Sequence, residues 1–117
     1  MANVNTIETF KILAQVDTTA SGANTLIDAY TVPAGTSTIL SSVIVTNRTT
    51  TDQRFRVSLA VAGAADDVKQ YLYFDVLIFE RDTFIATIGV TLATTDKVRV
   101  RADAVGITFN VVGVELT

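Results

Sequence analysis

The sequence predicts an all-β domain, an antiparallel β-sandwich of about eight short strands. Apolar and polar residues alternate with a period of two over most of the chain, as they do in half-buried strands. Turn signals separate these segments at intervals near the roughly 8–12 residues typical of a sandwich. No segment keeps a 3.6-residue period, so we expect almost no helix. Strand spacing alone leaves a jelly-roll and an immunoglobulin-like topology open.

Composition limits what the protein can do. The chain has 117 residues, 49% of them hydrophobic, enough for one domain with a core that needs no disulfide or metal. Its net charge of −3 argues against general binding to nucleic acid. Histidine and cysteine are absent, which removes the commonest general base and the usual transition-metal ligands. We therefore expect no enzyme, no cofactor and no metal site.

The beginning of the chain differs from the rest. Residues 1–7 are polar and carry no strand or turn signal, so we expect an arm that precedes a single β-sandwich domain over residues 8–117. The arm has neither the basic segment nor the apolar segment of a signal peptide. No apolar run approaches the 18 or more residues of a membrane span, and we expect no membrane contact.

The first half of the domain is expected to hold four strands. Pro33, the only proline, and Gly35 mark a corner after the second strand, because proline fixes φ and cannot donate to a strand ladder. The expected strands cover 8–16, 25–32, the stretch from this corner to Asn47, and 53–61. In the first, Phe10, Ile12, Ala14 and Val16 are expected on one side. In the second, Asp28 shares a face with Leu26, Tyr30 and Val32. In the third, Ile39, Ser41, Val43 and Val45 oppose Leu40, Ser42, Ile44 and Thr46. In the fourth, Phe55, Val57, Leu59 and Val61 oppose Arg54, Arg56, Ser58 and Ala60.

The second half is expected to hold four more strands, over 70–79, 83–90, 97–102 and 107–116. Residues 62–69 connect the two halves and have room for one helical turn, and residues 103–106 are typical of a hairpin connection. The strand over 97–102 is expected to turn Val98, Val100 and Ala102 inward.

The strand over 70–79 is apolar on both faces. Tyr71, Tyr73, Leu77 and Phe79 fall on one side, and Leu72, Phe74, Val76 and Ile78 fall on the other. Such a strand is either central in the sandwich or covered by another subunit. We therefore predict that Tyr71, Tyr73, Leu77 and Phe79 take part in protein–protein contacts.

Two pairs of arginines are expected to point outward, Arg54 with Arg56 and Arg99 with Arg101. One interpretation is cross-strand ion pairing with Asp28, Asp75 or Glu80. The other is docking onto an acidic protein surface, for which the arginine fork is well suited. We include these arginines among the predicted interaction residues.

Other patterns give no site. Asp66 and Asp67 lack the spacing of a calcium loop, and the chain has no Gly-x-Ser-x-Gly motif. The glycosylation sequon Asn47-Arg48-Thr49 is interpreted as incidental, because no signal peptide accompanies it.

Several stretches carry a resemblance to a known class of proteins. They are 26–36 (LIDAYTVPAGT), 44–48 (IVTNR), 55–57 (FRV), 60–66 with 69–71, and 92–100 (LATTDKVRV). Over roughly residues 24–115 the chain resembles the small β-rich structural proteins of tailed bacteriophages. The resemblance implies a non-enzymatic virion component, often trimeric, such as a capsid decoration (cement) protein, a head fibre, or a tail or baseplate piece.

The functional expectation follows from that resemblance. We expect a capsid decoration protein that is assembled into the virion in the host cytoplasm. It is expected to bind the assembled shell as a homo-oligomer, a trimer, with the major capsid protein or another virion protein as partner. A tail, neck or baseplate component is the second structural option. From a different class, a receptor- or carbohydrate-binding fibre module would need Tyr30, Tyr71 or Tyr73 exposed.

Overall fold

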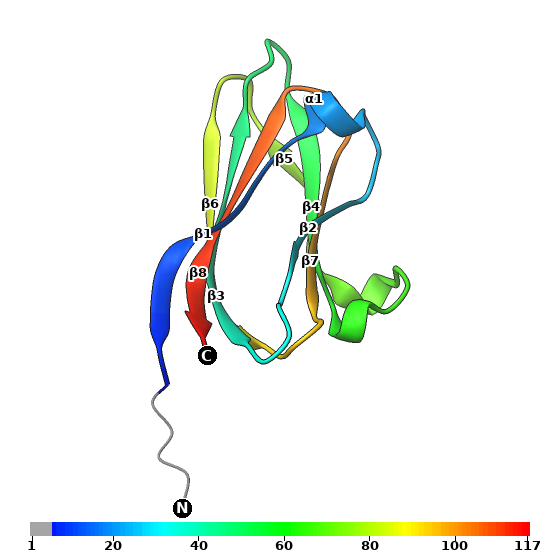
Figure 1. The fold of residues 1–117 in the computed structure, drawn as a ribbon. Coiled ribbons are helices and arrows are strands. Elements are labelled where there is room, and N and C mark those ends of the chain that lie inside the picture. Colours follow the sequence, from blue (N-terminus) through cyan, green and yellow to red (C-terminus); the bar gives the residue numbers. More distant parts are fainter. Residues whose placement is uncertain (1–5) are drawn as a thin grey trace, which may run out of the picture.

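The computed structural model, which describes residues 6–117, contains two antiparallel four-stranded sheets that pack face to face (Figure 1). The all-β sandwich expected from the sequence is confirmed, including its eight strands. The strands are β1 (Glu8–Asp17), β2 (Ile27–Thr31), β3 (Ser37–Asn47), β4 (Gln53–Ala60), β5 (Tyr71–Ile78), β6 (Thr83–Leu92), β7 (Lys97–Ala102) and β8 (Ile107–Leu116).

The strand order selects one of the two topologies that the sequence left open. One sheet has the order β1-β8-β3-β6 and the other has the order β2-β7-β4-β5. The first strand thus pairs with the eighth, the second with the seventh, the third with the sixth and the fourth with the fifth. A chain folded back on itself and then rolled up in this way is a jelly roll.

The core lies between the two sheets and is formed by their inward-facing residues. Phe55, Phe84 and Phe109 meet there. The ring centroid of Phe55 lies 5.4 Å from that of Phe84 and 6.3 Å from that of Phe109. The inward positions expected in the strand over 97–102 are confirmed, since Val98, Val100 and Ala102 are buried. Burial of these side chains from both sheets supplies most of the driving force for folding.

Bulges overturn the strict alternation expected along β1 and β3. In β1 an extra residue, Leu13, lies between the pairs Ile12–Val112 and Ala14–Val111. A bulge reverses the faces that follow it, so Phe10 and Ile12 lie exposed on the outer face while Ala14 packs against the core. The prediction that all four apolar residues of this strand share one side is therefore wrong.

In β3 the extra residue is Ser41, between Leu40 and Ser42. Leu40 and Val43 consequently both face the core, and Ile39 lies on the outer face. The expected grouping of Ile39 with Val43 is wrong for the same reason.

A bulge at Ala29 resolves the odd position of Asp28. It lies between the pairs Asp28–Arg99 and Tyr30–Val98, so Asp28 is exposed whereas Tyr30 is buried. The expectation that the two residues share a face is wrong, and the bulge spares the fold a buried carboxylate.

β5 is an edge strand of its sheet and does not lie at the centre of the sandwich. Its register against β4 shifts twice, and Asp75 at the second shift has a φ of 53°. Tyr73 packs against the core while Leu77 is exposed. The predicted common face of Tyr71, Tyr73, Leu77 and Phe79 is therefore wrong.

The connections follow the sequence in part. Pro33 accepts a turn hydrogen bond from Thr36 N, and Gly35 has a φ of 69°, as expected at the corner. One turn of helix, α1 (Thr18–Ser21), lies in the expected loop after β1, and the 61–70 connection contains the short 3₁₀ turns η1 (Val61–Gly63) and η2 (Val68–Gln70). Val61 belongs to η1 and is exposed, so the prediction that it shares a strand face with Phe55 and Val57, which are buried, is wrong.

Residues 103–106 cross from one sheet to the other, because β7 and β8 belong to different sheets. The expected hairpin is therefore wrong. At the N-terminus, Ile7 exchanges two backbone hydrogen bonds with Thr117, whereas residues 1–5 of the expected arm lie outside the described residues. Within residues 6–117 no helix is long and apolar enough to cross a membrane.

Candidate interaction surfaces

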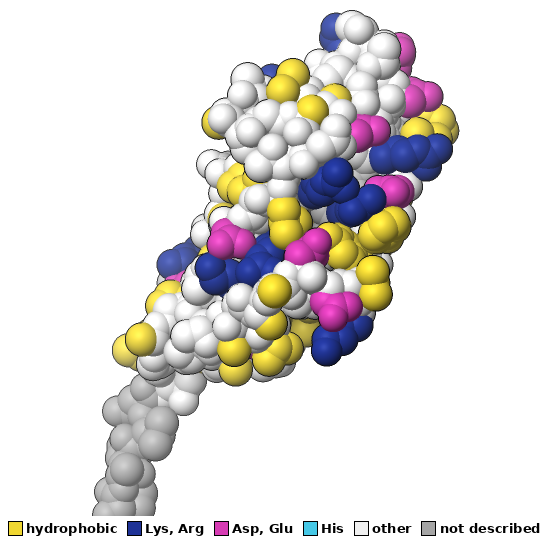
Figure 2. Space-filling view, turned by 90° about the vertical axis from the view of Figure 1, so that its right-hand side faces the viewer, with side chains coloured by type: hydrophobic (Ala, Val, Ile, Leu, Met, Phe, Trp, Pro, Cys, Tyr) yellow, Lys and Arg dark blue, Asp and Glu magenta, His cyan; other side chains and the backbone are white. Residues whose placement is uncertain are grey.

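The outer face of the β2-β7-β4-β5 sheet carries all four predicted arginines. Figure 2 looks onto this side of the molecule and shows basic and acidic side chains interspersed over it, with apolar side chains beside them. The register places Arg56 opposite Arg101 and Ser58 opposite Arg99 on neighbouring strands. We call this surface the charged face.

Arg99 and Asp28 form the first group on the charged face. Asp28 accepts from Arg99 Nε at 2.8 Å and from Lys97 Nζ at 2.9 Å, and these hydrogen bonds, that of Lys97 foremost, lower the pKa of Asp28. The Arg99 guanidinium also donates to the carbonyl oxygens of Ala64 and Gly63. Arg99 is only 8% exposed, so in this fold it holds the 61–70 connection against the sheet.

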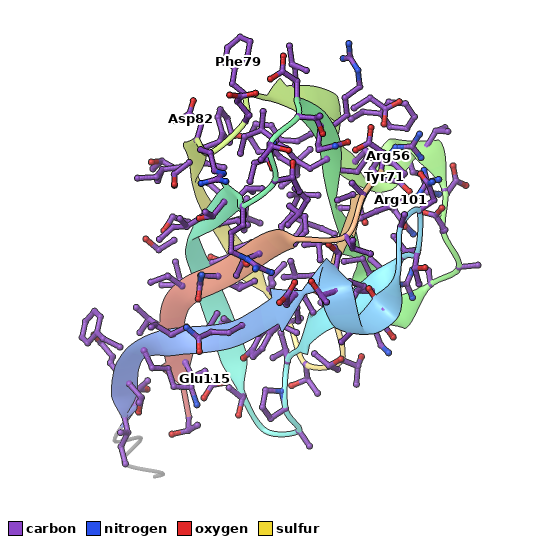
Figure 3. The ribbon with its side chains drawn as sticks, turned by 90° about the horizontal axis from the view of Figure 1, so that it is seen from above. Arg56, Tyr71, Phe79, Asp82, Arg101 and Glu115 are labelled. Atoms are coloured by element: carbon purple, nitrogen blue, oxygen red, sulfur yellow. The ribbon has the colours of Figure 1, made fainter. Side chains whose placement is uncertain are left out.

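Arg56 forms a second group with residues of β5. Its guanidinium donates to both carboxylate oxygens of Asp75, at 2.6 and 3.2 Å, and this hydrogen bonding is the main reason why the pKa of Asp75 is lowered. The same guanidinium lies over the ring of Phe74 at 3.9 Å from its centroid, and over that of Tyr71 at 5.7 Å. Figure 3 shows Arg56, Tyr71 and Arg101 on one side of the molecule.

Arg54 and Arg101 differ from the other two arginines. Arg54 Nη1 donates only to the backbone oxygen of Asp75, at 3.1 Å, and Arg101 Nη2 donates to Asn24 Oδ1 at 3.3 Å. Neither forms an ion pair with any carboxylate among residues 6–117. Ion pairing therefore occupies Arg56 and Arg99, and it leaves most donors of Arg54 and Arg101 available.

The predicted apolar contact residues of β5 are divided by its bulges. Tyr73 packs inside against Phe84, with ring centroids 5.6 Å apart. Tyr71 lies on the charged face, where its hydroxyl donates to Asp66 at 2.8 Å. Leu77 and Phe79 are exposed, and Figure 3 shows Phe79 near Asp82, away from Tyr71. These four residues do not form one surface, and their role in protein contacts stays a prediction.

A second apolar surface, which the alternation of the sequence did not predict, lies on the outer face of the β1-β8-β3-β6 sheet. Val114 of β8 lies between Phe10 of β1 and Ile39 of β3 and pairs with both. Two residues along from this row, Ile12 of β1 pairs with Val112 of β8. Phe10 is 74% exposed and Ile12 is 56% exposed. We call these five residues the apolar patch. The adjacent apolar pair Leu13-Ala14, which breaks the alternation, is the signal that could have revealed it.

Two of the three tyrosines that a carbohydrate-binding module would need on its surface point into the fold. Tyr30 is buried, and its hydroxyl donates to Glu115 at 2.5 Å and lies 2.9 Å from Thr38 Oγ1. Burial, together with the hydrogen bond to Glu115, raises the pKa of Tyr30 to about 12. Tyr73 lies in the core, so only Tyr71 offers part of its ring. Of the three tyrosines on which that function would depend, the structure therefore leaves only Tyr71 partly exposed on the charged face.

The described residues also bear on metal binding. Among residues 6–117, no three acidic side chains lie close enough together to hold a metal ion. Asp66, considered above for calcium, accepts from Tyr71, and Asp67 caps η2 by accepting from Lys69 N. Both carboxylates thus serve the local structure of the 61–70 connection.

Comparison with known proteins gives a likeness of fold. No protein-family model matches the chain, and no curated protein sequence matches it. A chain of the structure of infectious bursal disease virus Gx strain matches 97% of this chain with a TM-score of 0.53 and 9% identity. Our chain spans only 33% of that chain. At such low identity the likeness shows a shared fold and nothing further.

A second likeness is to the acid-stable capsid structure of Helicobacter pylori bacteriophage KHP30. It covers 97% of this chain and 94% of that chain, with 10% identity and a TM-score of 0.49. A likeness at this TM-score supports no conclusion about the present chain.

Proposed function

We propose that this protein is a non-enzymatic structural component of a virion, a capsid decoration protein that binds the assembled shell as a homo-oligomer. The observation that carries the proposal is the jelly-roll strand order. Eight-stranded jelly rolls occur in viral capsid and lectin domains and in cupins. The likeness to a chain of a virus structure and the resemblance of the sequence to phage structural proteins favour the first of these.

The chemistry of the side chains supports a structural role in a capsid over the role of a lectin or a cupin. The sequence holds no histidine or cysteine, the residues that most often bind catalytic metals or activate nucleophiles. The tyrosines that a lectin-like site would use are largely buried or engaged in hydrogen bonds. What the surface does offer is exposed apolar side chains and arginines, which are common in protein interfaces.

The apolar patch is the surface we assign to self-association. Its five residues lie side by side on three hydrogen-bonded strands, and contiguous exposed apolar surface of this kind marks interaction sites. Strand addition at the sheet edges is a poorer route, because β1, β2, β5 and β6 each contain a register shift. Bulges in edge strands disfavour pairing with another chain. Side-chain packing across the patch is therefore the expected contact.

The virion role is tested by locating the chain in particles. We expect mass spectrometry of particles purified from cultures that encode this chain to detect it in a fixed number of copies per shell. Immunogold electron microscopy should place it on the head. Labelling confined to the tail or baseplate would favour the second structural option, and absence of the chain from purified particles would contradict the proposal.

Self-association is tested by light scattering coupled to size-exclusion chromatography. We expect the wild-type chain to elute with a trimer mass, and the double variant Phe10→Ser/Ile12→Ser to shift toward the monomer, because it removes the two most exposed apolar side chains of the patch. Leu77→Ser/Phe79→Ser is the matched control and should keep the wild-type mass. Dissociation of the control alone would move the contact to β5, and a wild-type monomer at high concentration would exclude the oligomer.

A further inference from the structure

A small hollow on the charged face brings three arginines together. It is lined by Arg54, Arg56, Arg101, Asn24, Asp75, Ala102 and Asp103, and its volume is about 20 Å³. A space of roughly 10–15 Å³ on this measure holds one water molecule. The hollow therefore has room for the end of a small polar group.

Positive charge exceeds negative charge around this hollow. Three guanidinium groups face two carboxylates, and Arg56 lies directly opposite Arg101 on the neighbouring strand. Like charges placed opposite each other in a sheet repel. Asp75 relieves Arg56 through two hydrogen bonds, and Asp103 Oδ1 accepts from the backbone N–H of Arg54. Neither carboxylate forms an ion pair with the side chain of Arg54 or Arg101.

The unused N–H donors of Arg54 and Arg101 determine which chemical group fits the hollow. Each guanidinium carries five N–H donors in a planar fork, and each makes one hydrogen bond here, with lengths of 3.1 and 3.3 Å. A carboxylate matches such a fork with two oxygens in one plane. A tetrahedral phosphate is bulkier, and the chain's net charge of −3 disfavours approach to nucleic acid.

We infer that the hollow between Arg54, Arg56 and Arg101 binds a single carboxylate group, an aspartate or glutamate side chain presented by a partner protein. The inference deepens the interpretation that the outward arginines dock onto an acidic protein surface, and it rests on the proposed function for the identity of the partner. It also separates the four predicted arginines by task. Arg54 and Arg101 contact the partner, Arg56 positions Asp75 beside them, and Arg99 holds the 61–70 connection.

The test is a nuclear magnetic resonance titration that follows the arginine Nε–Hε signals. The probe is a short peptide with blocked termini and two glutamates, and its control is the same peptide with glutamines. We expect saturable shifts at Arg54 and Arg101 with the glutamate peptide alone, weakened by added salt. Arg54→Gln/Arg101→Gln should weaken binding at least tenfold. Lys69→Gln/Arg81→Gln changes the net charge equally at exposed sites that do not line the hollow, and it should bind within twofold of wild type.

Three results would overturn the inference. They are the absence of saturable shifts at Arg54 and Arg101, an equal loss of affinity in the control variant, and inorganic phosphate binding as tightly as the glutamate peptide. Arg101→Lys keeps the positive charge but loses the planar fork, so it should still bind the glutamate peptide less tightly than wild type. This single variant tests the site even if the double variant does not fold. The titration needs no particles, so failure of the virion proposal and failure of this site are distinguishable.

Discussion

Replacing Asn47 with alanine should lower the free energy of unfolding by about 3 kcal/mol, since it removes the hydrogen-bond partner of one buried and two partly buried backbone groups. The side chain is 0% exposed at the end of β3. Its Nδ2 donates to the carbonyl oxygens of Thr51 and Ile78, at 3.0 and 3.1 Å, and its Oδ1 accepts from Thr49 N at 2.9 Å. One amide thus ties the 48–52 turn to the end of β5.

Chemical denaturation of Asn47→Ala measures this effect, and Asn110→Ala is its matched control. Asn110 lies half-exposed on the outer face of β8, and its Oδ1 accepts one hydrogen bond, from Gln15 Nε2. Its replacement should therefore cost about 0.5 kcal/mol or less. Asn47→Asp should be at least as damaging as alanine at neutral pH, because a carboxylate would face two carbonyl oxygens in a buried place. Equal stability of Asn47→Ala and Asn110→Ala would contradict the assigned role.

The same burial bears on the sequon. The amide nitrogen that a glycan would modify is buried and already donates two hydrogen bonds. The folded protein therefore cannot be glycosylated at Asn47, which agrees with the interpretation of the motif as incidental.

Gly113→Ala is expected to destabilise the fold by about 2–3 kcal/mol, the range of overpacked core substitutions. Gly113 lies in β8 between β1 and β3. An added Cβ would collide with the backbone carbonyl oxygen of Ile39 and lie 3.0 Å from Leu13 Cδ1. A backbone oxygen within a sheet cannot move aside as a flexible side chain can, so β3 or β8 must shift.

Thermal and urea unfolding of Gly113→Ala should be compared with that of Gly35→Ala. Gly35 has open space around its Cα but a φ of 69°, so alanine there should cost only about 1 kcal/mol of backbone strain. A smaller loss for Gly113→Ala than for Gly35→Ala would show that the sheet yields at this point. Truncating Leu13 as well should not restore stability, because the main obstacle is the carbonyl of Ile39.

The bulges explain which strand faces follow the alternation of the sequence and which do not. Strands without a register shift, such as β7, behaved as their alternation predicts, with Val98 and Val100 inside and Arg101 outside. Wherever one extra residue enters a ladder, as at Leu13 and Ser41, every later side chain changes face. The pair Leu13-Ala14 interrupts the alternation and could have marked the first insertion, whereas Ser41 is followed by another serine, and nothing in that pair says which residue is the extra one.

The arginines of the charged face were likewise predicted only in part from the sequence. The sequence located the arginines on outward positions and offered Asp28, Asp75 and Glu80 as ion-pair partners. Arg99 pairs with Asp28 and Arg56 with Asp75, whereas Glu80 forms no ion pair within residues 6–117. The sequence could not tell the engaged Arg56 and Arg99 from the less occupied Arg54 and Arg101. That distinction depends on where the 61–70 connection folds over the sheet and on the bulge that places Asp75.

Local chemistry alone determined that this protein is an all-β sandwich with a proline corner and without histidine or cysteine chemistry, because alternation, turn residues and composition act over short distances along the chain. The tertiary structure decided the jelly-roll order, the surface position of Phe10 and Ile12, and the environment of each arginine. Those features arise from pairing between strands far apart in the chain, and β-bulges set the register of that pairing.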